Sequence, residues 1–288
     1  MSGPSFYGAV RGEAIKVSRQ LSLWLMLAGG FVLLGISLVA FTTIGSLPST
    51  ARTDPNTFLR QMFDVYGTIF QIGSGIVVLI VGSRLIAMEY SSGTIRIAYA
   101  RGVGRLQLLL AKAVLLAIIG IGLLVGYLLV VGAIVAALYA TWTGGLGGLN
   151  PDAALRQDFG YWLLVQGMSI GAVIMLTAAA AGLGRSLAFA MAASLAFFPV
   201  DNFLVGIMAL TARATGHNSP WRNITEYLLG PNLNVVLNAI EPDHLGRPAF
   251  APPLNPVDGQ HALFVIGAWA LVFAVVAVGR AVRPDVLE

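Results

Sequence analysis

The sequence predicts an all-α integral membrane protein with six transmembrane helices. Of its 288 residues, 57% are hydrophobic and only 10% are charged, whereas about a quarter of the residues of a soluble domain carry charge. Five runs of 19 or more residues contain no Asp, Glu, Lys or Arg, and one acid interrupts a sixth run. Runs of this length cross a bilayer as helices, since barrel strands would alternate over segments of ~10 residues.

A short interfacial helix is expected before the first span. One face of segment 5–20 carries apolar residues at helical spacing, and Leu21 continues the pattern. These residues are Phe6, Val10, Ala14, Val17 and Leu21. Cations occupy the rest of the helix surface, which is the pattern of a helix lying in the inner membrane interface. The alternative is a frayed cytosolic tail.

The six spans follow from the apolar runs. They are expected at about 21–45, 65–83, 113–140, 159–183, 186–210 and 261–279. At ~1.5 Å per residue each is long enough for the hydrocarbon core. In the third span Gly122 and Gly126 form a G-x-x-x-G pair, which predicts helix packing inside the bundle. Dimerisation of two subunits through this pair is the alternative.

One acid, Asp201, interrupts the fifth span two residues after Pro199. An acid inside a membrane suggests a functional site such as a transport pathway. The proline kink and a depth of roughly 22 Å from the start of the span favour instead a residue at the outer edge.

The segment 211–260 that follows is expected outside the membrane. Two short helices are expected in it, at 221–229 and 232–240, separated by a Gly-Pro step and dipping into the outer leaflet or covering a pathway.

The distribution of cations predicts the orientation. With the N-terminus inside, inner segments hold 11 of the 17 Lys and Arg residues and the longer outer segments hold six. The positive-inside rule then places both termini in the cytosol.

Five of the inner cations lie between the second and third spans, in the stretch 84–112. There, Ser91, Ser92 and Gly93 predict the start of a short helix, and Gly102 and Gly104 predict its end. Such a projecting basic helix resembles a handle for another protein.

The chain lacks the chemistry of an enzyme or an energy source. It contains no cysteine, no G-x-x-x-x-G-K-[ST] phosphate loop and no H-E-x-x-H motif. The spans contain no facing acid–base pairs of the kind that drive ion-coupled transporters. The three histidines have no metal-ligand spacing, and we expect no metal, no catalytic residue and no nucleic-acid partner. Energy for any transport would therefore enter through another chain.

Residues of the inner stretch resemble a known family. Glu89, Gly93, Thr94, Arg105 and Lys112 match the pattern E-x3-G-T, then R, then six residues and K. This pattern is similar to the inner loop of type-2 ATP-binding-cassette (ABC) exporter permeases. The tail Arg280–Val286 resembles the basic-basic-Asp-Val ending of the same family, with Pro284 as a departure. The resemblance extends over essentially the whole chain.

The resemblance implies a set of partners. Such permeases pair as homodimers or heterodimers in the bilayer, and each binds a separate ABC ATPase subunit, which carries the ATP and Mg. A coupling helix at 94–100 would contact the ATPase, and the N-terminal helix would form an elbow. Arg96, Arg101 and Arg105 would pair with acids of the partner, unless they serve only to orient the chain. Glu89 would contact the partner or form a salt bridge with a neighbouring cation.

These expectations define the function. The chain is expected to be a multi-pass permease of a bacterial inner membrane that exports a hydrophobic or amphipathic substrate. The alternative is a membrane anchor or assembly factor that binds an ATPase without moving a solute. A stand-alone membrane enzyme is disfavoured because no catalytic constellation is visible.

Overall fold

The computed structural model describes residues 5–42, 45–100, 102–216, 218–240 and 250–282. The helices are α1 (Phe6–Ser18), α2 (Leu21–Thr42), α3 (Leu47–Thr53), α4 (Pro55–Ser91), α5 (Thr94–Ala100), α6 (Arg105–Thr143), α7 (Ala153–Gly184), α8 (Leu187–Thr215), α9 (Asn218–Thr225), α10 (Leu229–Ile240) and α11 (Gly259–Val282). Two of the three histidines, His217 and His244, and the tail from Arg283 onward lie outside the described residues.

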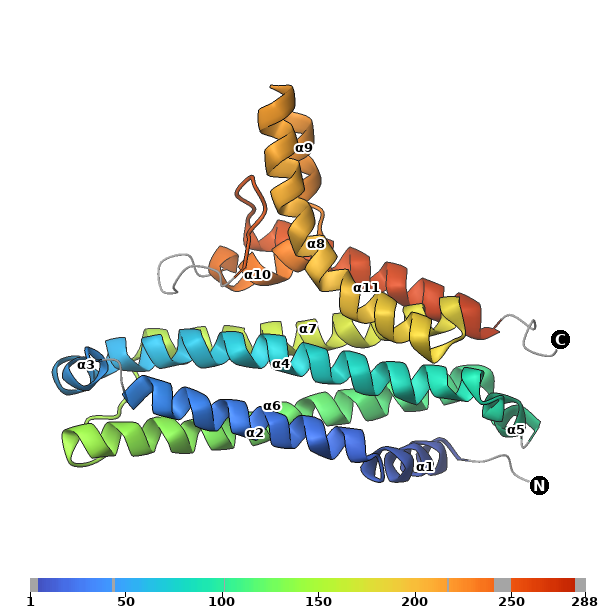
Figure 1. Ribbon diagram of the computed structural model, residues 1–288, viewed down its shortest axis with the longest axis horizontal. Helices are drawn as coiled ribbons and strands as arrows, with labels where there is room; N and C mark the ends of the chain where they lie inside the picture. Colours follow the sequence, from blue (N-terminus) through green and yellow to red (C-terminus); the bar gives the residue numbers. More distant parts are fainter. Residues whose placement is uncertain (1–4, 43–44, 101, 217, 241–249, 283–288) are drawn as a thin grey trace.

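The long helices form a bundle with two distinct ends. α4, α6 and α7 run along its length, with α3 at one end and α5 at the other (Figure 1). We call these the α3 end and the α5 end. α4, α6, α7, α8 and α11 are each long and apolar enough to cross a membrane, and α1 with α2 makes a sixth candidate if this bent pair counts as one span. The predicted all-α membrane fold is confirmed.

Two helices, α4 and α6, are longer than a bilayer requires. α4 has 37 residues and α6 has 39, which at 1.5 Å per residue gives about 55 Å against a hydrocarbon core of about 30 Å. Local signals set their ends. Asp54 accepts a hydrogen bond from the Thr57 N–H at the start of α4, and Gly144 ends α6 in the left-handed conformation. These helices therefore project beyond the membrane and carry polar groups at both ends.

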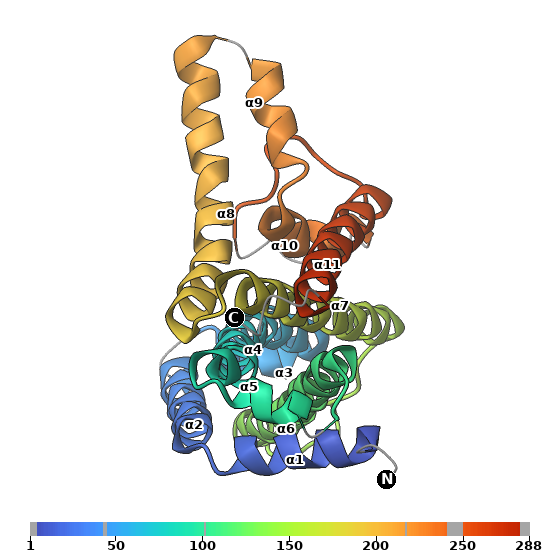
Figure 2. The same cartoon turned by 90° about the vertical axis from the view of Figure 1, so that its right-hand side faces the viewer.

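The elbow predicted before the first span is present as a bend. α1 and α2 meet at 64°, and α1 lies across the ends of the bundle helices (Figure 2). The Trp24 indole N–H donates to the Ser18 carbonyl across this bend, at 2.9 Å. α1 turns Glu13 and Val17 toward the bundle, where both are buried, while Phe6 of the predicted apolar face is 43% exposed.

Glycines permit close contacts of α4 and α6 with α7. A Cβ atom at Gly82 of α4 would lie 2.8 Å from Cγ2 of Thr177, and one at Gly120 of α6 would lie 2.7 Å from Cγ2 of Ile170. Side chains of α4, α6, α7 and α11 form the main core around these contacts. Close backbone approach at small residues is how membrane helices gain packing energy, because lipid gives no hydrophobic drive between helices.

The predicted packing glycines take a different position. A Cβ atom at Gly122 or Gly126 would meet no atom within 4 Å, so neither glycine faces a neighbour in the described part of the chain. The prediction that this pair packs inside the bundle is therefore wrong. Gly120, two residues earlier, lies on the contacting face of α6. The alternative, contact with a second subunit, stays a prediction.

The second half of α8 departs from the bundle. α8 contains Pro199, which lacks the N–H of the helical ladder, and it bends outward to form a protruding arm with α9 (Figures 1 and 2). The buried Asp201 carboxylate accepts a hydrogen bond from the Gly230 N–H at the start of α10. This contact caps α10 against α8 and accounts for an acid in an apolar run.

The segment after α8 forms two short helices whose boundary differs from the expected one. Gly230 and Pro231, expected to separate them, lie in the first turn of α10. Proline is tolerated there because the first N–H groups of a helix have no intrahelical partner. The Thr225 hydroxyl accepts a hydrogen bond from the Leu254 N–H at 2.9 Å, which holds the returning chain against α9.

Gly120→Ala is expected to destabilise the protein, whereas Gly122→Ala is expected to leave stability unchanged or raise it. The added methyl group at Gly120 overpacks the contact with Ile170, at a cost of about 1–3 kcal/mol. At Gly122 the methyl group meets open space, and alanine favours a helix. The melting temperature of each variant in detergent measures the difference. Equal melting temperatures would contradict the assigned packing faces.

Candidate functional site

A short helix crosses the α5 end between two long helices. Gly93 and Gly102 have φ angles of +68° and +80°, which glycine adopts without steric cost. They let the chain leave α4, form α5 and turn into α6. The Ser92 and Thr94 hydroxyls lie 2.9 Å apart at the first turn. α5 spans Thr94–Ala100. Its start agrees with the serine and glycine pattern, and the range 94–100 is the one that the family resemblance implies for the coupling helix.

α5 has one anchored side chain and one exposed face. Ile95 is 4% exposed and packs inward, whereas Ile97 is 54% exposed. Thr94, Ile97 and Ala100 are all exposed and recur every three residues, so they share a face. An exposed isoleucine on a short helix at the projecting end of the bundle can serve as an apolar anchor for another protein. Sequence reasoning emphasised the cations of this loop and missed Ile97.

The end of the loop is stiffened by a cation–π contact. The Arg105 guanidinium carbon lies 5.2 Å from the centre of the Tyr99 ring, within the range of such interactions. Burial raises the pKa of Tyr99 to about 12. Arg96 belongs to α5, but its side chain lies outside what the structure describes, and Arg101 lies outside the described residues.

Four charged residues form a closed cluster behind α5. The Lys16 Nζ atom lies 2.6 Å from an oxygen of Glu13 and 2.6 Å from an oxygen of Glu89. The Lys112 Nζ atom lies 2.9 Å from the other Glu89 oxygen and 3.5 Å from the other Glu13 oxygen. Lys112 also donates to the Leu85 carbonyl. Charges alternate around this ring, so the cluster is neutral and joins α1, α4 and α6.

The cluster is mostly removed from water. Glu13 is 4% exposed, Glu89 is 9% exposed and Lys112 is 3% exposed, while the Lys16 side chain is 55% exposed. Burial of the carboxyl raises the pKa of Glu89, but Lys112 and Lys16 outweigh this effect and hold it below its ordinary value. For Lys16 the signs are reversed. Burial lowers the pKa of this lysine, but its hydrogen bonds to Glu13 and Glu89 outweigh burial and raise the pKa overall.

These shifts set the pH range of the cluster. A lowered carboxyl pKa stabilises the fold above the ordinary carboxyl range, and this contribution is lost as the pH falls through the folded pKa. A raised lysine pKa stabilises the fold below the ordinary lysine value, and this contribution is lost as the pH rises through the folded pKa. Both contributions of Glu89 and Lys16 are therefore present throughout the neutral range.

The cluster changes the assignment of two predicted contact residues. Of the two roles left open for Glu89, the structure contains the salt bridge, with Lys16 and Lys112. Lys112 is buried and cannot reach a surface partner. Glu13 and Lys16 are 73 or more residues away from Glu89 in the sequence, and no local pattern links them. Their own spacing, an acid and a lysine three residues apart on a membrane-adjacent helix, is the signal available in the sequence.

Comparison with known proteins identifies one family. The family model described as "ABC-2 family transporter protein" matches residues 9–205. This range contains α5 and all four residues of the charged cluster. No curated protein matches the chain.

Lys112→Met is expected to destabilise the protein strongly, by about 3–5 kcal/mol, because it leaves two buried carboxylates with one partly exposed lysine. Lys16→Met is the matched control. It removes the exposed lysine of the same ring and is expected to cost about 1 kcal/mol or less. Melting temperatures of both variants in detergent at neutral pH test the difference, and a larger loss for Lys16→Met would refute the described burial.

Proposed function

Because this chain belongs to the ABC-2 transporter family, we propose that it exports a hydrophobic or amphipathic substrate using ATP hydrolysed on a separate subunit. The chain is a multi-pass permease subunit and is not itself the ATPase. ATP and Mg would be bound by the ATPase, which would dock on α5. A second copy of the chain, or a related permease, would complete the transport unit.

The observation that carries this proposal is the exposed face of α5. Thr94, Ile97 and Ala100 project from the bundle at the junction of α4 and α6. A groove on a soluble ATPase can enclose such a helix and bury Ile97. Because only a few residues separate α5 from each neighbour, a displacement of α5 acts directly on two helices that cross the membrane.

The charged cluster extends this coupling to α1. Glu89 lies in the last turn of α4, and Lys112 lies two turns into α6, so both are close to α5 along the chain. Their shared contacts with Glu13 and Lys16 tie the elbow to the same unit. Buried ionic contacts tolerate little change in geometry, since separating the charges leaves them unpaired in a poor solvent. The α5 end would therefore move as one body when the ATPase closes.

The placement of the α5 end in the cytosol is part of the proposal. It is supported by the excess of Lys and Arg in the segments assigned to that side, and an ATPase needs access to cytosolic ATP. The bacterial inner membrane is the setting that we infer.

Ile97→Asp is expected to weaken ATPase binding at least about tenfold, because a charge replaces an apolar anchor at the contact. Leu146→Asp is the matched control, since Leu146 is also 54% exposed but lies near the α3 end. Co-purification with an ABC ATPase and stimulation of its ATP hydrolysis measure the effect. Equal loss or equal retention in both variants would refute α5 as the docking site.

Uptake of substrate into vesicles that contain the purified complex distinguishes a transporter from an anchor. ATP hydrolysis without substrate uptake would identify an anchor.

Single cysteines are expected to report the orientation, because the natural chain has none. In intact cells a membrane-impermeant maleimide should label Leu146→Cys and should not label Thr94→Cys. Permeabilised cells should allow both to react, since both positions are exposed. Labelling of Thr94→Cys in intact cells would overturn the cytosolic placement of α5.

A further inference from the structure

A cavity of about 570 Å³ lies between α4, α6 and α7 near the α3 end. Its volume falls within the range of about 300–1,000 Å³ that is typical of ligand sites. Phe63, Tyr66, Tyr127, Phe159 and Trp162 contribute aromatic walls, and Gly132 leaves one side open. The cavity is far from α5 and from the charged cluster, and the proposed function does not use it.

The walls of the cavity are ordered and apolar. The Trp162 ring packs against the Phe63 ring at 5.7 Å and the Phe159 ring at 5.9 Å between centroids. The Tyr127 hydroxyl donates to the Tyr66 carbonyl at 2.7 Å, so this polar group of the wall is already satisfied. The lining therefore favours a hydrocarbon chain over a polar solute.

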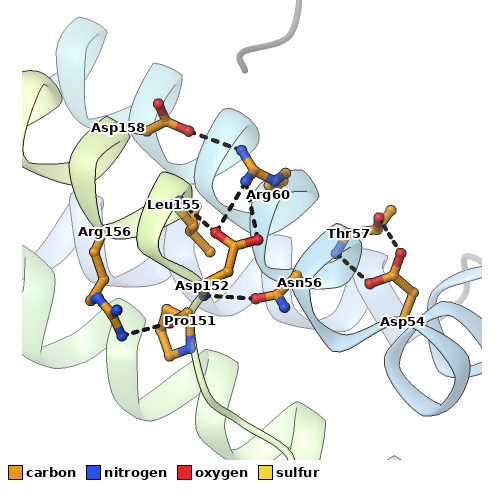
Figure 3. A network of polar contacts seen from close by, with 9 residues as sticks. All are labelled: Asp54, Asn56, Thr57, Arg60, Pro151, Asp152, Leu155, Arg156 and Asp158. Carbon is orange, nitrogen blue, oxygen red and sulfur yellow. Dashed lines mark hydrogen bonds and ion pairs between the residues drawn. The ribbon is translucent and has the colours of Figure 1, made fainter. Parts of the chain in front are cut away.

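The mouth of the cavity carries an exposed cation. Arg156 lines the cavity, and its guanidinium donates one hydrogen bond, to the Pro151 carbonyl at 2.9 Å. A guanidinium has five N–H donors, so this contact uses only part of its capacity. Figure 3 shows Arg156 reaching toward Pro151 on the side away from Arg60.

Nearby acids are engaged by a different arginine. Arg60 lies 2.9 Å from an Asp158 oxygen and 3.2 Å from an Asp152 oxygen (Figure 3). Asp152 also accepts a hydrogen bond from the Leu155 N–H at 2.7 Å, where it caps α7. Asp158 is fully buried. These bonds direct both carboxylates to Arg60 and the α7 backbone, while Asp152 also interacts electrostatically with Arg156. Of these two arginines, Arg156 is the one that lines the cavity.

Cation and cavity have the geometry of a lipid site. Arg156 and Trp162 are six residues apart on α7, which corresponds to about 9 Å along the helix. The cavity thus runs from a charged group at the predicted membrane edge into the apolar region. A phospholipid in the adjacent leaflet has the same order of groups, with its phosphate at the edge and its acyl chains toward the centre. Arginine is well suited to bind phosphate oxygens.

We propose that this cavity binds a phospholipid, with one acyl chain between α4, α6 and α7 and the phosphate on Arg156. The lipid joins the α3 ends of three helices that otherwise leave a gap, and it is held by an apolar and an ionic contact together. The site is independent of ATPase docking, so its test needs no partner subunit.

Trp162 supplies the readout, because bromine atoms on an acyl chain quench tryptophan fluorescence at short range. The purified chain in detergent is titrated with phosphatidylglycerol carrying brominated chains, and with diacylglycerol carrying the same chains but no phosphate. We expect saturable quenching by the phospholipid, with a half-saturation at least about tenfold lower than for diacylglycerol. Trp162→Phe should remove the saturable component, which assigns it to the cavity.

Three variants test the two halves of the site. Gly132→Leu should fill the cavity and abolish saturable quenching. Val135→Trp, in protein that keeps Trp162, should displace the acyl chain from the same wall. Mass spectrometry of the brominated lipid that stays bound to the protein measures this second effect. Gly126→Leu is the matched control, because its added side chain also meets open space but does not line the cavity. Arg156→Gln should raise the phospholipid half-saturation to the diacylglycerol value.

Unchanged quenching in Gly132→Leu together with unchanged lipid retention in Val135→Trp would overturn the cavity as the site. Equal half-saturation for phospholipid and diacylglycerol in the natural chain would overturn recognition of the phosphate, and would leave a cavity that accepts any apolar chain.

Discussion

The structure depends at one end on a ring of four buried or half-buried charges. Glu13, Lys16, Glu89 and Lys112 come from three helices and neutralise one another. Each charge would be costly alone in a region with little water. Together they require α1, α4 and α6 to keep one relative position. Moving one of these helices would separate the paired charges and leave them unpaired. The ring therefore fixes the relative position of the three helices near the place where α5 joins two membrane-crossing helices.

The remainder of the bundle is held by shape. α7 lies at the centre of the core, and the glycines at positions 82 and 120 allow α4 and α6 to approach it closely. The two ends of the bundle differ in chemistry. The α5 end has a neutral ionic ring behind an exposed helix, whereas the α3 end has the Arg60 network beside an apolar cavity. The proposed ATPase contact and the proposed lipid site therefore lie at opposite ends of the bundle.

Several parts of the site could be predicted because they depend on local chain chemistry. Gly93 and Gly102 require positive φ angles at both ends of α5, and this requirement is readable without any knowledge of neighbours. The exposed face was not predicted. In an amphipathic soluble helix the polar face identifies the surface, but Ile97 is apolar and exposed, and Ile95 is apolar and buried. Only the packing of α5 against the bundle distinguishes them.

The sequence by itself determined the class of the protein, the existence of the long spans and the limits of α5, because each rests on composition, run length or turn chemistry. The tertiary structure decided which small and charged residues meet. Both faces of a membrane helix are apolar, so hydropathy carries no information about which glycine of α6 contacts a neighbour. Likewise Lys16 and Glu89 are 73 residues apart, and their pairing exists only because α1 folds back across α4 and α6.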